Sequence, residues 1–325
     1  LPFEIEGREP FTKRRLLSCL ASSFDPLGFI GFALVPAKLI LQTAFRLGCD
    51  WDDVLPEELQ SAIGSWIEDL KRIEKLKISR PFVPASYDQV SRRELHILAD
   101  SSTTCFAAIG FLRTVLSDDT IHVSLVASRN RLAPLKGLSV PRLELCAAQL
   151  AARLYNLIRS ELEFTIDRTF FWSDSMATLG LIRNTTSRFP VYVANRQAEI
   201  QETTQIGDWH YINTKINVAD GLSRGIFPDT FEEHPYFHGP AFLRRGREFW
   251  PKEHFDALVL TTFEEVQTPE VIEETAMATI EITTSFAESF FPKFGTLLRL
   301  KLAVSWWLRF FDYMRDRSQV RTGDI

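Results

Sequence analysis

The sequence predicts an α/β fold in which a mixed β-sheet with flanking helices follows a small helical region and precedes a linker and one amphipathic helix. Three observations predict this order. Apolar residues recur at helical spacing before residue 78, short β-branched and aromatic runs begin near residue 93, and a helical pattern returns after residue 290. We therefore expect four regions, at residues 1–85, 93–226, 227–290 and 291–325.

The first 85 residues predict three helices. Thr12 is a candidate N-cap of a short basic helix that ends at Asp25-Pro26-Leu27-Gly28. A second helix is expected from Pro36 to about Leu47, with apolar Leu39, Ile40 and Ala44 on one side. A third is expected from Pro56 to about Leu76, where apolar residues follow helical spacing.

The second region predicts a mixed sheet with helices packed on it, and one compact domain accounts for it. A turn at residues 117–120 joins two of the strands as a hairpin. The expected elements are, in chain order, strands at 95–99, 105–115 and 121–127, a helix at 141–160, a strand at 168–173, helices at 175–184 and 190–202, a strand at 208–213 and a short helix from 217.

The last 99 residues predict little regular structure before a final helix. Residues 227–290 are expected to form an irregular acidic linker, since the stretch 253–292 contains no Lys or Arg. The helix expected at about 296–316, within residues 291–325, is amphipathic and too apolar to stand alone.

Charge and composition narrow the class of protein. The net charge of −5 excludes a global basic field as the attraction for nucleic acid. Residues 129–153 are locally basic, with five cations against Glu144 (5 − 1 = +4). We expect four of those cations to hold the phosphates of a polyanionic substrate: Arg129, Arg131, Lys136 and Arg142.

The four cysteines and the lack of long apolar runs indicate an intracellular protein. The cysteines are widely separated and form no C-x-x-C pair, as is typical of reduced thiols. No apolar stretch approaches the roughly 18–20 residues of a membrane helix, and no secretory signal is present. Because the chain begins at Leu1, we expect a fragment of a longer polypeptide.

Four carboxylates are the candidate catalytic residues. Asp100 and Asp174 each follow an apolar run, Glu144 lies in the first turn of the expected helix at 141–160, and Asp220 lies in the segment 217–224. An acid after a core strand is exposed at the strand's end, where open α/β sheets bind ligands. Four such acids can hold two divalent cations for phosphodiester cleavage.

Mg²⁺ is the expected metal because it prefers oxygen ligands, with Mn²⁺ as a substitute. We expect Asp100 to bridge two ions, Glu144 and Asp174 to complete one site, and Asp220 to face the second. Each acid alone also has an ordinary explanation. Asp220 could be a surface partner of Arg224, Glu144 a partner of the helix dipole, and Asp174 a helix cap.

Four motifs around these acids resemble one family. The motifs are Leu98-Ala99-Asp100-Ser101-Ser102, Pro141-Arg142-Leu143-Glu144-Leu145, Trp172-Ser173-Asp174-Ser175 and Asn217-Val218-Ala219-Asp220-Gly221-Leu222-Ser223-Arg224-Gly225. They are similar to the ribonuclease H domain of BEL/Pao-type LTR retrotransposon polyproteins. The resemblance implies a ribonuclease H-like fold that cuts the RNA strand of RNA–DNA hybrids, with Asp100, Glu144, Asp174 and Asp220 as its metal-binding acids.

The resemblance extends to the flanking regions. Residues 1–85 look like a reverse transcriptase thumb or connection region, and residues 291–325 look like a helix leading towards integrase. The implied partners are an RNA–DNA hybrid and the reverse transcriptase and integrase regions of the same polyprotein, with no membrane. The implied location is an intracellular, cytoplasmic particle, with the nucleus as a second site.

Some family features are absent from the sequence. It contains neither the polymerase motif Tyr-x-Asp-Asp nor the zinc module of integrase. Aspartic peptidase activity is not supported, since Asp100-Ser101-Ser102 and Asp174-Ser175-Met176 lack the glycine of Asp-Thr/Ser-Gly. His210 precedes Asp220 by ten residues, but we expect it on a strand rather than on a catalytic loop. The alternative to a nuclease is a catalytically silent or co-opted copy that binds nucleic acid or a partner.

Overall fold

The computed structural model describes residues 10–73, 76–78, 82, 89–185, 189–225, 227 and 234–252. All of them belong to the first of two compact units, Leu1–Thr268. The helix expected at 291–325 and the linker residues 253–290 lie outside the described residues. Within those ranges, none of the helices combines the length and the apolar content that a bilayer span requires.

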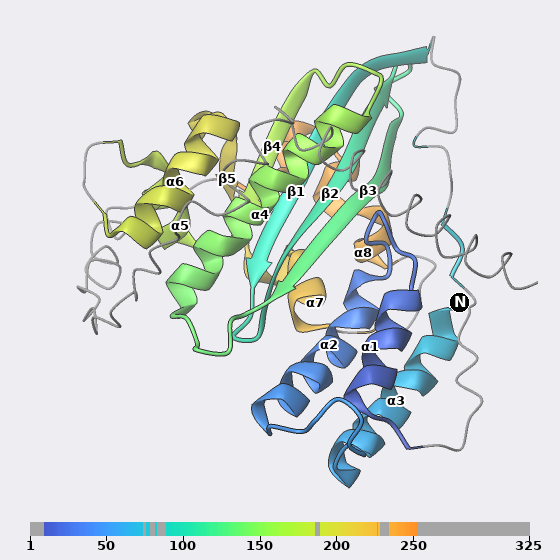
Figure 1. The fold of residues 1–325 in the computed structure, drawn as a ribbon. Coiled ribbons are helices and arrows are strands. Elements are labelled where there is room, and N and C mark those ends of the chain that lie inside the picture. Colours follow the sequence, from blue (N-terminus) through green and yellow to red (C-terminus); the bar gives the residue numbers. More distant parts are fainter. Residues whose placement is uncertain are drawn as a thin grey trace, which may run out of the picture. The chain divides into compact units, whose positions relative to one another are not determined.

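A five-stranded mixed sheet organises this unit (Figure 1). Its spatial order is β3-β2-β1-β4-β5; the first three strands pair antiparallel, and β4 and β5 continue the sheet in parallel. The strands are β1 Val90–Ser101, β2 Cys105–Leu116, β3 Ile121–Leu132, β4 Arg168–Ser173 and β5 Trp209–Tyr211. The expected α/β fold with a mixed sheet is confirmed.

One face of the sheet is covered by a long helix, α4, which spans Val140–Glu161 and contacts β1, β2 and β3. Its alanines and leucines pack with residues of the strands in one buried cluster. The small side chains allow close packing: a Cβ added at Gly110 of β2 would lie 2.8 Å from the Ile158 side chain. Helices α5 (Met176–Arg183) and α6 (Val191–Thr203) pack against α4 in turn.

The other face is covered by the N-terminal helices and by short helices that follow β5. These are α1 Lys13–Ser22, α2 Gly31–Arg46, α3 Glu57–Ile73, α7 Ala219–Arg224 and α8 Pro235–His238. Their apolar residues and those of the strands form one buried cluster. Figure 1 shows α2 beside α7 below the sheet, and both helices contact each other. The helical region and the sheet therefore share a core.

A close approach at Gly28 connects the helical region to β3. Its φ of +77° is in the left-handed region, and an added Cβ would lie 2.1 Å from the Ser128 carbonyl oxygen, so only glycine fits. The Ser128 hydroxyl and the Tyr236 hydroxyl both donate to the Gly28 carbonyl. Three segments distant in sequence thus meet at one turn.

Helix α2 begins five residues earlier than the sequence predicted. The Asp25 carboxylate accepts from the backbone N–H groups of Phe29 and Ile30, which orders the chain before Gly31. Pro36 then lies inside the helix rather than at its start. The buried α2 face and a hydrogen bond from the Trp66 indole to the Ala33 carbonyl (2.7 Å) stabilise the helix despite the proline.

Residues 234–252 differ from the irregular linker that was expected from residue 227. They form α8 and two single 3₁₀ turns, Ala241–Arg244 and Arg247–Phe249. Tyr236, Phe237, Phe242 and Leu243 are buried in the shared core. The sequence pattern missed this packing because the apolar residues are grouped without helical or strand periodicity.

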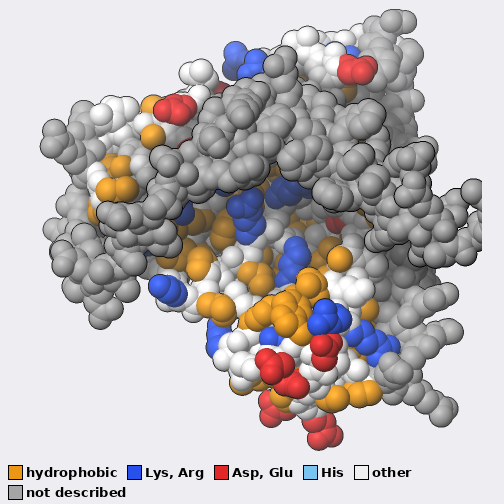
Figure 2. All heavy atoms as spheres, in the orientation of Figure 1, with side chains coloured by type: hydrophobic (Ala, Val, Ile, Leu, Met, Phe, Trp, Pro, Cys, Tyr) orange, Lys and Arg blue, Asp and Glu red, His pale blue; other side chains and the backbone are white. Residues whose placement is uncertain are grey.

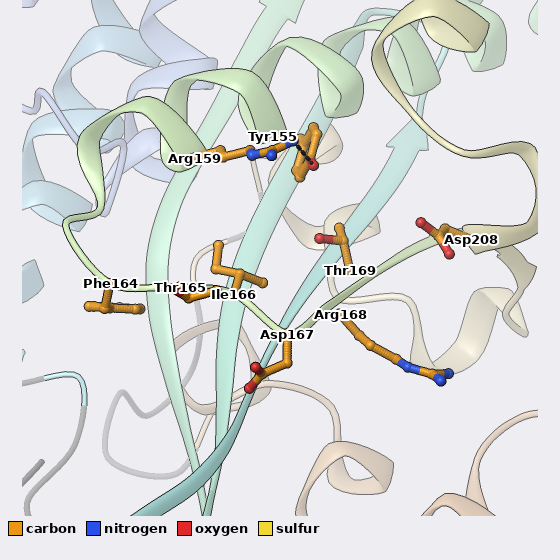
Figure 3. A pocket seen from close by; sticks show the side chains of 9 residues that line it. All are labelled: Tyr155, Arg159, Phe164, Thr165, Ile166, Asp167, Arg168, Thr169 and Asp208. Carbon is orange, nitrogen blue, oxygen red and sulfur yellow. Dashed lines mark hydrogen bonds between the residues drawn. The ribbon is translucent and has the colours of Figure 1, made fainter. Parts of the chain in front are cut away.

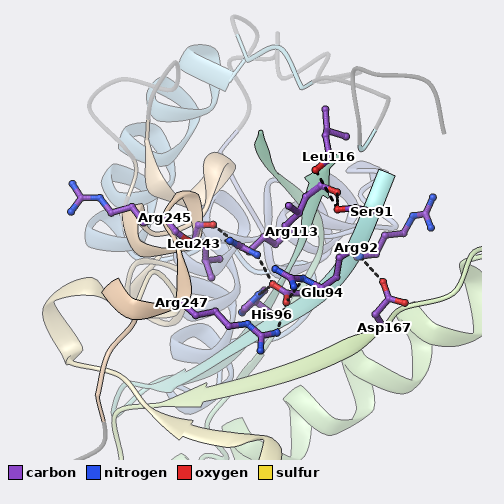
Figure 4. Close-up of polar contacts among 12 residues, drawn as sticks. Ser91, Arg92, Glu94, His96, Arg113, Leu116, Asp167, Leu243, Arg245 and Arg247 are labelled. Carbon is purple, nitrogen blue, oxygen red and sulfur yellow. Dashed lines mark hydrogen bonds and ion pairs between the residues drawn. The ribbon is translucent and has the colours of Figure 1, made fainter. Parts of the chain in front are cut away.

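A buried ionic cluster holds this segment to the start of β1 (Figure 4). The Glu94 carboxylate is fully buried, accepts hydrogen bonds from Arg113 (2.6 Å) and Arg247, and forms an ion pair with Arg92 (3.0 Å). Arg113 also donates to the carbonyls of Leu243 (2.7 Å) and Arg245 (3.0 Å). The negative charge of Glu94 is thus matched by cations from β1, from β2 and from residues 234–252.

Candidate active site

The acids meet at the edge of the sheet where β1 and β4 end. The two strands are parallel, and Ala99 pairs with Ser173 in the register. Asp100 of β1 and Asp174, directly after β4, are the next residues along the two segments, so they are brought side by side. Each of these two segments therefore delivers one carboxylate to the same end of the sheet.

Glu144 reaches the same point from the N-terminal part of α4, just after the first turn, which begins at Val140 and contains Pro141. One carboxylate oxygen from each of Asp100, Glu144 and Asp174 lies within 4.8 Å of the other two. These three residues are the acidic triad. Three separate elements, β1, β4 and α4, supply one member each.

Asp220 lies in the first turn of α7 and is not a member of the triad. Its carboxylate pairs with Arg224 at 2.6 Å, one helical turn away, as the surface-acid explanation of this residue predicted. It nevertheless lies close enough to the triad that its negative charge helps to raise the pKa of Asp100. The structure thus brings three predicted acids together and places the fourth beside them.

The triad is electrostatically unfavourable in the chain alone. Burial, with the charges of Asp174 and Asp220, raises the pKa of Asp100 to about 7. Burial, with the charges of Asp100 and Asp174, raises the pKa of Glu144 to about 8. Carboxylates this close disfavour each other's ionisation, and a cation between them would relieve that repulsion.

Two uncharged side chains from the segment 217–223 orient the triad. The Ser223 hydroxyl donates to Asp100 Oδ2 at 2.6 Å. Asn217 Nδ2 donates to the Ala99 carbonyl at 3.0 Å and is 3.4 Å from Asp174 Oδ1. We did not predict these two residues as site residues, although both stand in the motif around Asp220.

The structure contradicts the helix-cap explanation of Asp174, and the helix-dipole explanation of Glu144 does not account for the burial of its carboxylate. Ser175, not Asp174, caps α5, since its side chain accepts from the Thr178 N–H. Glu144 does lie near the start of a helix, but its Oε2 is buried and has no hydrogen-bond partner among the described residues. A buried carboxylate oxygen without a partner is costly, which is consistent with a site built for a ligand that brings positive charge.

These features fit a divalent metal. The triad offers only oxygen ligands, the ligand type that Mg²⁺ prefers. Its raised pKa values, the partnerless oxygen of Glu144 and the orienting contacts from Ser223 and Asn217 are the properties expected of a carboxylate metal site.

The predicted cationic residues occupy different settings. Arg129 donates to the carbonyls of Ser128 and Pro26, both at 2.8 Å, so its guanidinium stabilises the Gly28 turn. Arg131 and Lys136 are exposed, and Arg142 lies over the Tyr192 ring at 5.3 Å. Figure 2 shows Lys and Arg side chains in the middle of one face and a group of acidic side chains near the lower ends of α2 and α3.

His210 lies on β5, as predicted, and not on a loop. Its ring is 5.7 Å from the Phe170 ring and 5.3 Å from the Trp172 ring, between centroids. It is part of an aromatic layer on the sheet.

A mixed sheet of this strand order, with acids at the ends of its two central parallel strands and on the helix that crosses them, defines a ribonuclease H-like domain. The chain belongs to the family described as the Pao retrotransposon-like RNaseH-like domain, whose model matches residues 12–175. The match begins at α1, so the N-terminal helices are part of the family's domain. It includes the whole triad and ends before Asp220.

Solved structures show distant likenesses. The RNase H1 of the halophilic archaeon Halobacterium salinarum NRC-1 is 14% identical, with a TM-score of 0.28, over 41% of this chain and 94% of that one. The protease-reverse transcriptase of a foamy virus, in complex with double-stranded DNA, is 13% identical, with a TM-score of 0.38, over 65% of this chain and 34% of that one.

A third structure, the N-terminal RNase H domain of rv2228c from Mycobacterium tuberculosis, is 11% identical, with a TM-score of 0.27, over 40% of this chain and 95% of that one. Scores and identities this low assign no residue roles. No curated protein matches the chain.

Proposed function

We propose that this chain is a two-metal ribonuclease H-type endonuclease that cuts the RNA strand of RNA–DNA hybrids within a retrotransposon polyprotein. The observation that carries the proposal is the acidic triad, in which three elements deliver one carboxylate each within 4.8 Å. Family membership supports the context, because a retrotransposon is copied through RNA–DNA hybrids.

Asp100, Glu144 and Asp174 would hold the divalent cations, with Mg²⁺ expected and Mn²⁺ as a substitute. When bound, such ions stabilise the charge that develops on the phosphate and make a water molecule nucleophilic. Asp220 is the proposed ligand of the second ion. Its carboxylate is held by Arg224, so this use would compete with an existing ion pair.

The chain's own residues position the acids. Ser223 fixes one oxygen of Asp100, and Asn217 links Asp174 to the backbone of β1 through the Ala99 carbonyl. The ends of β1 and β4 and the segment 217–223 are therefore connected by hydrogen bonds. Such outer contacts orient metal ligands and are expected to matter for activity.

Cleavage of a labelled RNA–DNA hybrid by the full chain in Mg²⁺ tests the proposal. The unsubstituted chain is expected to cut the RNA strand and to leave the DNA strand intact. Asp100→Asn and Asp174→Asn should each lower the rate about 100-fold or more, the size of loss seen when one charge-stabilising group is removed from an active site.

Asp118→Asn is the matched control, because that aspartate is exposed in the β2–β3 hairpin, and its rate should be unchanged. A folded wild-type chain that leaves the hybrid intact would refute the nuclease. It would favour a silent copy that only binds.

A further inference from the structure

A cavity of about 380 Å³ lies beside the segment that orients the acidic triad. One wall comes from residues 215–221, which span the end of a 3₁₀ turn and the start of α7. The other wall comes from residues 234–241, which include α8. We call this cavity the α7 pocket. Its volume is within the range of sites that bind small molecules, roughly 300–1,000 Å³.

The α7 pocket has a closed floor and an open rim. In the floor, Asn217 and Tyr236 are 4% and 2% exposed, and Pro240 is also buried. The rim is formed by exposed residues from both walls: Lys215, Ile216, Pro235 and Ala241. A small molecule could therefore enter from solvent and cover the apolar surface without displacing the floor.

The lining favours an apolar molecule that carries a negative charge. Most of the residues that line the pocket are apolar, and burial of an apolar body against them is favourable. The Tyr236 hydroxyl already donates to the Gly28 carbonyl, so the floor offers the molecule mainly its ring surface. Lys215 is the one charged residue of the described lining, so with His234 neutral the formal charge of the lining is +1.

A larger cavity at the start of β4 has a different character (Figure 3). Its volume is about 510 Å³, and it lies at the opposite end of β4 from Asp174. Its charged lining residues balance, since two arginines are matched by two acids: Arg159, Arg168, Asp167 and Asp208. An apolar anion would meet two carboxylates there, so we expect it to prefer the α7 pocket.

The α7 pocket is linked to the triad through two residues of one wall. The Asn217 amide nitrogen, at the floor, is 3.4 Å from Asp174 Oδ1. Gly221 is followed two residues later by Ser223, whose hydroxyl donates to Asp100 Oδ2 at 2.6 Å. A molecule that packs against this wall therefore contacts the segment that positions two of the three acids.

We propose that the α7 pocket binds a small apolar anion, with Lys215 as its counter-charge, and that this binding raises the affinity of the acidic triad for a divalent metal. A molecule that fits the pocket as described favours the arrangement in which Asn217 faces Asp174. Such coupling is reciprocal, so metal at the triad raises the affinity for the anion by the same factor. The binding step depends on the pocket alone, and the coupling rests on the metal site of the proposed nuclease.

Titration of the full chain with anilinonaphthalene sulfonate, an aromatic anion that fluoresces in apolar surroundings, tests the binding step. Ala241→Trp places a bulky side chain at the rim and should raise the Kd of the dye about tenfold or more. Ala21→Trp, at an exposed position of α1, is the matched control and should leave Kd unchanged. Lys215→Gln should raise Kd about threefold, whereas Lys77→Gln, at another exposed lysine, should not.

The same titration in saturating Mg²⁺ tests the coupling. Mg²⁺ should lower the Kd of the dye about fivefold in the wild-type chain. This effect should vanish in Asp174→Asn, which lacks a metal ligand, and in Asn217→Ala, which lacks the link between the pocket and the triad. The ratio of the two Kd values is the readout, so a change in dye affinity alone does not alter it.

If Ala241→Trp fails to fold, Gly221→Leu fills the pocket from the other wall, where an added Cβ would meet no atom within 4 Å. A Kd that neither variant changes would overturn the pocket as the binding site. Full displacement of the dye by an RNA–DNA hybrid would place the pocket in the path of the substrate and would also overturn a separate site.

The two proposals fail in different ways. Dye binding that Mg²⁺ does not affect, in a chain that cuts the hybrid, would overturn the coupling and leave the nuclease in place. Dye binding that Mg²⁺ strengthens, in a chain that does not cut, would refute the nuclease and leave the α7 pocket as a site coupled to the metal.

Discussion

Two buried carboxylates, Glu94 and Asp100, lie on the same face of β1, at the two ends of the part of β1 that pairs with β4 or continues beyond it, and they are in opposite electrostatic states. Burial disfavours ionisation of Glu94, but His96, Arg247 and the charge of Arg113 outweigh it and lower its pKa to about 2. Asp100 has acids for neighbours instead, so its pKa is raised to about 7.

Burial alone therefore does not decide whether an acid has a structural or a ligand-binding role. The Glu94 end carries its own counter-charges and joins three segments, which is a structural arrangement. The Asp100 end lacks them and gains by binding a cation from outside. His96 beside Glu94 follows the same logic: burial lowers its pKa to about 4, and the neutral ring accepts at Nδ1 from the Trp172 indole (3.2 Å).

Loss of the Glu94 charge should destabilise the fold more than any other change considered. Glu94→Gln leaves the buried Arg113 without its partner, and we expect the free energy of unfolding to fall by about 3 kcal/mol. Urea unfolding measures it. Glu163→Gln, at an exposed position, should change it by less than about 0.5 kcal/mol. If Glu94→Gln also lowered the free energy of unfolding by less than about 0.5 kcal/mol, the ionic cluster would not hold residues 234–252 to the sheet.

Added Mg²⁺ should stabilise the folded chain through the acidic triad at the Asp100 end, and not through the Glu94 end. At 100 times its Kd, a ligand that binds only the folded state adds about 2.7 kcal/mol, which a melting curve reports. The Asp174→Asn variant should lose the increase. Glu94→Gln should keep it, from a lower starting Tm. An increase that persists in Asp174→Asn would place the cation elsewhere.

Asn217→Ala should weaken metal binding at the acidic triad without removing a charge. Because the amide orients Asp174, its loss is expected to lower the apparent Mg²⁺ affinity about tenfold. Titration of hybrid cleavage against Mg²⁺ measures this, and Asn156→Ala on the exposed side of α4 is the control. Equal titration curves for the two variants would show that the contact does not orient the ligand.

Acid should weaken the Glu94 end gradually. Folding lowers the pKa of Glu94 from 4.5 to about 2, so the unfolded chain binds more protons within this window. The contribution of Glu94 is therefore complete above pH 4.5 and is lost as the pH falls towards 2. The difference in unfolding free energy between wild type and Glu94→Gln should shrink over this range. A constant difference would contradict the assigned shift.

The sequence predicted most elements because their periodicity is local. The β-branched, aromatic and small apolar runs of β1 to β3 and the apolar stripe of α3 depend on residues a few positions apart. The acids after apolar runs could be located in the same way, although their grouping stayed a prediction until β1 and β4 were placed in register.

Other features depend on residues far apart in sequence. The burial of Glu94 and His96 required Arg113 and Arg247, up to 153 residues away. The start of α2 at Gly31 depended on the Asp25 carboxylate and on packing that overrides the usual position of proline. The contact of the Arg129 guanidinium with the Pro26 carbonyl joins residues 103 positions apart, and no local pattern indicates it.

The shared core also limits how a chain of this family can recombine. Gly28 touches Ser128 and Tyr236, so residues 10–73 are fitted to this particular sheet and to residues 234–252. A recombinant that joined this sheet to the helical region of a diverged relative without glycine at that turn would clash with Ser128. Viable recombinants should therefore inherit the N-terminal helices, the sheet and residues 234–252 from one parent.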